Sequence, residues 1–163
     1  MKFKEFFYLK EAFDYVPENI NKTVKDRGRE VDISYEFSIG RLTYDVVFSI
    51  QKDTKSTSFL FSNTNEEYEE HPMSILNTGE KGASQKVFGA VINIFNQFIT
   101  QYIRHVKDVY FIANKNDKNR ARLYDRFVTT GFIKNNFDVD IDDIDAIRKY
   151  ILTPKINAND NNL

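Results

Sequence analysis

The sequence has no cysteine and only a few residues of histidine, proline and glycine. Of its 163 residues, none is cysteine or tryptophan, two are histidine, three are proline and six are glycine. The absence of cysteine excludes disulfides, thiolate catalysis and cysteine-ligated metal. The two histidines, His71 and His105, are far apart along the chain, and this separation does not favour a histidine-rich metal site. We therefore expect no metal centre.

Net charge of one sign and long apolar runs are also missing. Lysine and arginine total 23 against 24 acidic residues, a formal net charge of −1. No global basic field would therefore attract nucleic acid or an anionic membrane. No apolar run approaches the roughly 20 residues that span a bilayer, and the first residues lack the apolar stretch of a secretory signal. We expect a cytoplasmic protein that binds neither membrane nor nucleic acid.

Aromatic residues are abundant, with 15 phenylalanines and nine tyrosines. The length fits one domain, so we expect a single folded unit over residues 1–153 with an aromatic-rich core. Residues 1–16 place phenylalanines among charged residues and predict an amphipathic helical segment. The asparagine-rich residues 154–163 predict a disordered tail.

Apolar residues alternate with polar ones in three consecutive runs, 31–39, 42–51 and 56–62. Alternation predicts half-buried strands, and the short connections predict an antiparallel meander. The polar stretch 19–29 before them is interpreted as a loop.

The second half of the chain alternates between predicted strands and helices. The expected elements are a strand at 73–76, a loop at 77–84, a helix at 85–106 capped by Ser84, a strand at 108–113, a helix at 120–130, a strand at 132–139 and a helix at 144–152. We therefore expect an α/β (α+β) fold with a mixed, mostly antiparallel central sheet and helices on both faces.

The loop before the long helix is the first candidate site. It contains Gly79, Lys81, Gly82, Ala83 and Ser84. A glycine-containing turn that leads into a helix N-terminus directs free backbone N–H groups at one point, which suits an anion such as a phosphate. The alternative interpretation is a plain turn that begins a helix.

The strand at 108–113 leads to the second candidate site. A polar loop from Asn114 to Asn119 follows it, and the next helix carries Tyr124. Ligands of α/β sheets favour crevices beyond the carboxyl ends of strands, and a tyrosine hydroxyl there can act as a general acid. The alternative is that Tyr124 only contributes to the buried face of its helix.

Aspartates recur at alternate positions from Asp138 to Asp145. This pattern is similar to a calcium-binding loop, but Asp143 stands where such a loop has glycine and Lys149 where it has glutamate. We interpret the run as a strand end followed by the N-cap of a helix.

Together the first two sites resemble the GNAT acyltransferase superfamily. The matching pieces are the loop 79–84, the long helix, the strand Val109–Ala113, Leu123-Tyr124 and Gly131-Phe132. The resemblance implies that backbone amides of Gly82, Ala83 and Ser84 hold the pyrophosphate of acetyl-CoA or another acyl-CoA. Gly79, Lys81, Asn114 and Asn119 are further candidates for contact with this cofactor.

The same resemblance implies a reaction. Tyr124 would protonate the departing thiolate while an acyl group passes to an amine of a small molecule or a protein. Gly79 stands where the family has arginine or glutamine, and Asp117 and Arg120 replace its asparagine and alanine, so the match is a divergent one. The opening residues also resemble the N-termini of tailed-phage proteins. The alternative function is a catalytically inactive acyltransferase-like phage scaffold that binds a host or virion protein, in the host cytoplasm or the virion.

Overall fold

The computed structural model describes residues 17–64 and 83–155. Their elements, in chain order, are β1 (Asn21–Asp26), β2 (Glu30–Ile39), β3 (Leu42–Gln51), β4 (Ser56–Asn63), α2 (Ala83–Tyr102), the short 3-10 helix η2 (Ile103–His105), β5 (Asp108–Asn114), α3 (Lys118–Val128), α4 (Gly131–Asn136), β6 (Phe137–Ile144) and β7 (Ile147–Pro154). The predicted segment 1–16, the strand predicted at 73–76 and residues 156–163 of the predicted tail lie outside the described residues.

The antiparallel meander predicted from alternation is confirmed. β2, β3 and β4 pair in sequence order, and the register of β2 with β3 closes at Ile39 opposite Leu42. The two residues between them form a tight turn in which Gly40 takes a positive φ of 58°. Glycine adopts that conformation without steric cost, so the sequence favours this hairpin.

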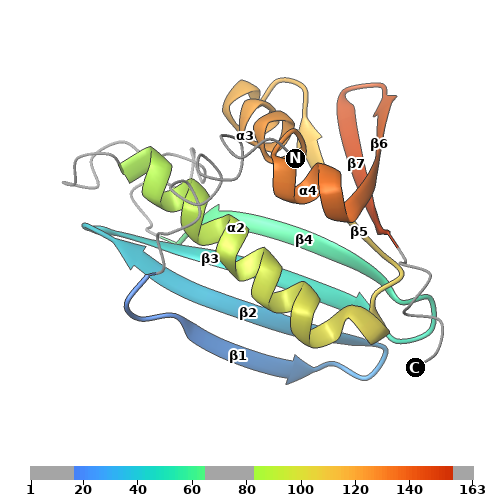
Figure 1. Cartoon of the computed structure of the whole chain (residues 1–163), viewed down its shortest axis with the longest axis horizontal. Helices are drawn as coiled ribbons and strands as arrows, with labels where there is room; N and C mark the ends of the chain where they lie inside the picture. The colour runs from blue at the N-terminus through green and yellow to red at the C-terminus, as the bar shows by residue number, and fades with distance from the viewer. Residues whose placement is uncertain (1–16, 65–82, 156–163) are drawn as a thin grey trace.

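The seven strands form one mixed sheet in the order β1-β2-β3-β4-β5-β7-β6 (Figure 1). β4 and β5 run parallel, and every other neighbouring pair is antiparallel. Parallel neighbours need a long crossover, and α2 lies within the chain segment that makes it. The predicted mixed, mostly antiparallel sheet is therefore confirmed.

One face of the sheet carries the core. Phe48 of β3 contacts Phe95 and Phe98 of α2, and Phe95 also contacts Phe127 of α3. Phe59 of β4 contacts both helices. The two helices therefore cover the same face (Figure 1). Among the described elements, no helix lies on the other face, where we had also expected helices.

The last third of the chain differs from the prediction. Gly131–Asn136 is the helix α4 where a strand had been predicted from residue 132, and the helix predicted at 144–152 is the strand β7. Apolar residues at 144, 147 and 151 have helical spacing, but the side chains of Tyr150 and Leu152 alternate toward the core. Pairing of β7 with both β5 and β6 decides the conformation.

The stretch predicted as a loop at 19–29 contains the edge strand β1. Its sequence shows no apolar alternation, and all six of its residues are exposed. It is a strand because its backbone pairs with β2 from Asn21 to Asp26. No helix in the described ranges, 17–64 and 83–155, is both long and apolar enough to cross a membrane.

Candidate functional site

β4 and β5 pair over a short distance and then separate. Only three residue pairs join them, from Ser56 opposite Asp108 to Ser58 opposite Tyr110. Beyond this point β4 continues through residues 59–63 and β5 through residues 111–114, with no pairing between the two. Figure 1 shows β4 continuing toward the start of α2 and β5 toward α3. We call this region the β4–β5 divergence.

Tyr124 of α3 lies at the β4–β5 divergence. Its side chain is 2% exposed. Its ring meets Phe111 of β5 edge-on at 4.7 Å and lies 6.3 Å from Phe59 of β4, measured between ring centroids. One tyrosine of the helix thus contacts both separating strands. The predicted buried face of this helix is confirmed at Tyr124 and Phe127.

The pKa of the Tyr124 hydroxyl is raised above its ordinary value of 10.0, chiefly because burial disfavours the phenolate. The charge of Arg120 and a hydrogen bond from the backbone of Phe61 act in the opposite direction with smaller effect. The Phe61 backbone lies in the part of β4 that β5 no longer pairs with. Tyr124 is therefore a protonated phenol at neutral pH whose oxygen contacts a diverging strand.

Arg120 is one turn before Tyr124 on the same helix. Its Nε is buried and has no hydrogen-bond partner among the described residues; the carboxylate of Asp117 lies 3.6 Å away. Asp117 is the N-cap of α3, where its side chain accepts a hydrogen bond of 3.1 Å from the Arg120 backbone. Arg120 and Tyr124 are four residues apart, so they lie on the same face of α3. From the sequence we had not expected Arg120 to take part in the site.

A hydrogen bond between Tyr150 of β7 and Asp125 of α3, close to Tyr124, holds α3 against the sheet. The hydroxyl of Tyr150 donates a 2.5 Å hydrogen bond to Asp125, and the Tyr150 ring lies 5.8 Å from that of Tyr124. Arg148 reaches Asp125 at 3.3 Å and Asp143 at 2.8 Å. These contacts fix α3 against β7 and thereby the position of Tyr124.

The other predicted cofactor residues divide into two groups. Asn114 ends β5, where its side chain accepts a hydrogen bond from the backbone of Asn116 and so shapes the turn into α3. Asn119 lies in the first turn of α3. Both are at the carboxyl end of β5 in the chain, where the strand leads into α3. Contact of Asn114 and Asn119 with a cofactor stays a prediction.

The predicted anion-binding loop is described only at its end. Ala83 and Ser84 are the first two residues of α2, so Ser84 lies within the helix and is not the N-cap that we predicted. The first turn of α2 carries no acidic residue. Gly79, Lys81 and Gly82 lie outside the described residues.

The aspartate run lies mainly along the exposed edge strand β6 rather than at a helix N-terminus. Arg148 donates to Asp143 and lowers the pKa of that carboxyl. Asp145 adopts a positive φ of 53° in the turn to β7, so neither Asp142 nor Asp143 caps a helix as predicted. In the part of the chain that the structure describes, no three histidine, cysteine or acidic side chains are grouped to hold a metal ion.

Comparison of the chain with protein-family models, with curated proteins and with solved structures finds no match.

Proposed function

We propose that the chain binds an acyl-coenzyme A at the β4–β5 divergence and transfers its acyl group to an amine, as a divergent GNAT-like N-acyltransferase. The observation that carries the proposal is the separation of β4 and β5 after three residue pairs, with Tyr124 contacting both strands. The order of elements supports it, because an antiparallel meander precedes a long helix, a strand and the helix with Tyr124, as the resemblance implies.

The diverging strands suit the chemistry of the coenzyme A arm. Strand backbones that separate leave N–H and C=O groups without ladder partners, and such groups require other hydrogen-bond partners. Pantetheine is an extended chain with two amide groups, so it can pair with them as an added strand would. The first turn of α2, which has free backbone N–H groups, would meet the pyrophosphate.

Tyr124 supplies the proton in this scheme. The amine nitrogen attacks the thioester carbonyl, the carbon–sulfur bond breaks, and the thiolate takes the phenolic proton of Tyr124; water accepts the proton that the amine loses. A raised pKa keeps the phenol protonated at neutral pH, as an acid requires. Arg120, whose charge acts on Tyr124, would stabilise the phenolate that forms.

Acetyl-CoA binding tests the proposal directly. Acetyl-CoA should raise the melting temperature of the protein in a saturable way. Gly82→Asp, which adds a carboxylate to the predicted pyrophosphate loop, should abolish this shift. Asn96→Asp adds the same charge to an exposed position of α2 and should leave the shift unchanged. No shift at millimolar acetyl-CoA would reject the proposal.

A second candidate function is the inactive scaffold that binds a host or virion protein. The packing of the Tyr124 ring among aromatic rings favours it, because a side chain that is 2% exposed is also what a purely structural role requires. Thiol release from acetyl-CoA in the presence of a panel of amines separates the two candidates. Release supports the enzyme, whereas the absence of both acetyl-CoA binding and thiol release supports the scaffold.

A further inference from the structure

A second feature lies at the other end of the sheet, where β3 turns into β4. A cavity of about 400 Å³ opens there between the sheet and the carboxyl end of α2. Small-molecule sites commonly have volumes of about 300–1,000 Å³. The β4–β5 divergence follows the opposite end of β4, so the cavity is separate from the site proposed for acyl-coenzyme A.

The walls of the cavity are mainly aliphatic. Val24 of β1, Val31 and Ile33 of β2, and Ile50 of β3 line it, and Tyr102 at the end of α2 faces them. The registers place Val24 opposite Ile33 and Val31 opposite Ile50, so the four side chains form one continuous strip across three strands. Val24 remains 59% exposed. An aliphatic chain laid along this strip would bury its own methylene groups and the methyl groups of Val24.

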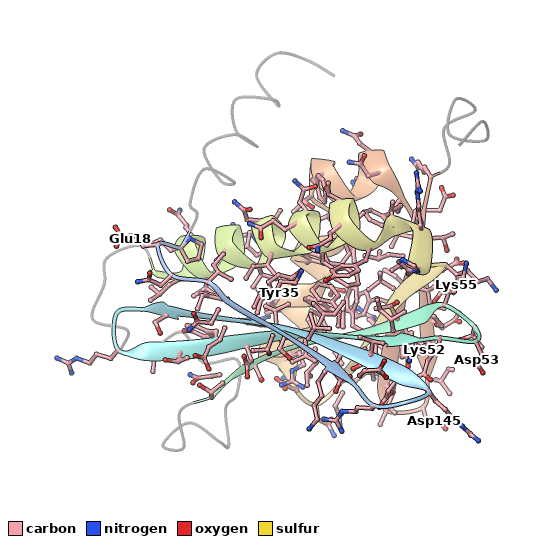
Figure 2. The ribbon with its side chains drawn as sticks, turned by 90° about the horizontal axis from the view of Figure 1, so that it is seen from below. Glu18, Tyr35, Lys52, Asp53, Lys55 and Asp145 are labelled. Carbon is pink, nitrogen blue, oxygen red and sulfur yellow. The ribbon has the colours of Figure 1, made fainter. Side chains whose placement is uncertain are left out.

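The rim of the cavity is basic. Lys52, Lys55 and His105 line it, and none of its lining residues is acidic. Lys52 is ion-paired with Asp26 at 2.8 Å, but the ammonium of Lys55 contacts no carboxylate within the described ranges. Figure 2 shows Lys52 and Lys55 at the same end of the sheet. One positive charge at the mouth therefore has no neutralising carboxylate among the residues that the structure describes.

Lys55 occupies a backbone conformation that costs free energy for a lysine. Its φ is 59°, in the left-handed region that favours glycine and asparagine. Two backbone hydrogen bonds hold it, one from its N–H to the carbonyl of Gln51 and one to its carbonyl from the N–H of Lys107, each 2.8 Å long. The second bond ties the turn to the segment between η2 and β5, and the lysine is fixed at the mouth of the cavity.

We propose that this cavity binds a medium-chain aliphatic carboxylate, with the chain on the valine and isoleucine strip and the carboxylate at Lys55. The strip supplies apolar contact along the length of a chain, and Lys55 supplies the complementary charge at one end. A chain without an anionic group would leave Lys55 unpaired, and a short anion would leave the strip exposed. Both halves of such a ligand are therefore needed for tight binding.

Titration of the full chain with decanoate below its micelle threshold tests the proposal, with calorimetry and thermal shift as readouts. We expect saturable binding that is weaker for decanol and acetate and weakest for decyltrimethylammonium. Lys55→Asn removes the charge but tolerates the left-handed backbone, and should weaken decanoate binding about two- to five-fold, the effect of an exposed ion pair. Lys25→Asn on β1, at a residue that does not line the cavity, should leave binding unchanged.

A steric pair of variants tests the location of the site. Val24→Trp should fill the cavity and abolish saturable binding, whereas Thr23→Trp, on the adjacent exposed residue of β1, should not. The proposal is overturned if decanoate does not bind saturably, if decanol or decyltrimethylammonium binds as tightly, or if each variant behaves like its matched control. Acetyl-CoA titration of Val24→Trp should match wild type, so failure here is distinguishable from failure of the acyltransferase proposal.

Discussion

The ring of Phe48 on β3 lies parallel to the ring of Phe98 on α2, with centroids 3.8 Å apart and planes within 3° of each other. Both side chains are completely buried. This contact joins the centre of the sheet to the last turns of the long helix, and Phe48 also contacts Phe59 and Phe95. α2 is therefore fixed to the sheet by aromatic packing.

Phe98→Ala should destabilise the protein by about 3–5 kcal/mol, because truncation of a buried phenylalanine loses burial and leaves a cavity. Urea denaturation followed by circular dichroism measures the change. Ile103→Ala, at an apolar residue near the same end of the helix that is 42% exposed, should cost less than about 1 kcal/mol. Equal losses in the two variants would contradict the proposed importance of the aromatic stack.

Tyr124→Phe keeps the ring and removes the acid. The proposed mechanism predicts that kcat with acetyl-CoA falls by roughly 10²–10⁴-fold, the usual contribution of a general acid, while KM for acetyl-CoA changes little. In wild type the rate should fall only as the pH rises past the raised pKa of the phenol, above its ordinary value of 10.0. A variant with unchanged kcat would remove Tyr124 from the chemistry.

Tyr150→Phe removes a hydroxyl that is fully partnered. That hydroxyl donates to Asp125 at 2.5 Å, and hydrogen bonds to charged groups contribute about 1.5–3 kcal/mol. We expect a loss of stability of this size by urea denaturation, together with weaker protection of α3 amides from hydrogen exchange. Unchanged stability would show that Asp125 does not need Tyr150 to hold α3.

Tyr35→Phe removes a hydroxyl that is buried without a hydrogen-bond partner among the described residues. Figure 2 places Tyr35 between the sheet and α2. Because an unpartnered buried polar group costs free energy, the variant should be as stable as wild type or more stable, by up to about 1 kcal/mol. It is thus the matched control for Tyr150→Phe, and a loss of stability equal to that of Tyr150→Phe would contradict both assignments.

The same tyrosine predicts a dependence on alkaline pH. Burial raises the pKa of Tyr35 to about 12 from an ordinary 10.0, with Tyr102 adding to the effect. A folded-state pKa above the unfolded one stabilises the fold fully below about pH 10, and this contribution is lost as the pH rises from about 10 to 12. Wild type should therefore lose more stability over that interval than Tyr35→Phe does, as measured by urea denaturation at each pH.

The sequence predicted the part of the fold whose side chains alternate with burial. β2, β3, β4 and the long helix follow from apolar periodicity, because each packs one face on the core. β1 has no buried side chain, so only its backbone pairing with β2 makes it a strand. β7 has apolar residues at helical spacing, and pairing on both sides overrides that local signal.

The sequence predicted only part of the candidate site, namely the strand β5 and the helix that carries Tyr124. Both elements were predicted, because burial and chain order are visible in sequence; the catalytic role of Tyr124 stays a prediction. The early separation of β4 from β5 has no sequence signal, since both strands continue with apolar residues, Phe59–Phe61 and Phe111–Ala113, after their last paired residues. The burial of the Arg120 Nε beside Asp117 likewise has no sequence signal, because helical spacing alone does not reveal it.

The short parallel ladder between β4 and β5 is also the boundary between two parts of the sheet. Three residue pairs, from Ser56 opposite Asp108 to Ser58 opposite Tyr110, form the ladder that joins strands β1–β4 to strands β5–β7 in the sheet. Strands β1 to β4 pair between chain neighbours, whereas this ladder joins residues about fifty positions apart, so we expect it to form later than the meander. Because the contacts of Phe59 and Phe95 with Phe127 also cross this boundary, we expect the two parts of the sheet to be held together mainly by side-chain packing.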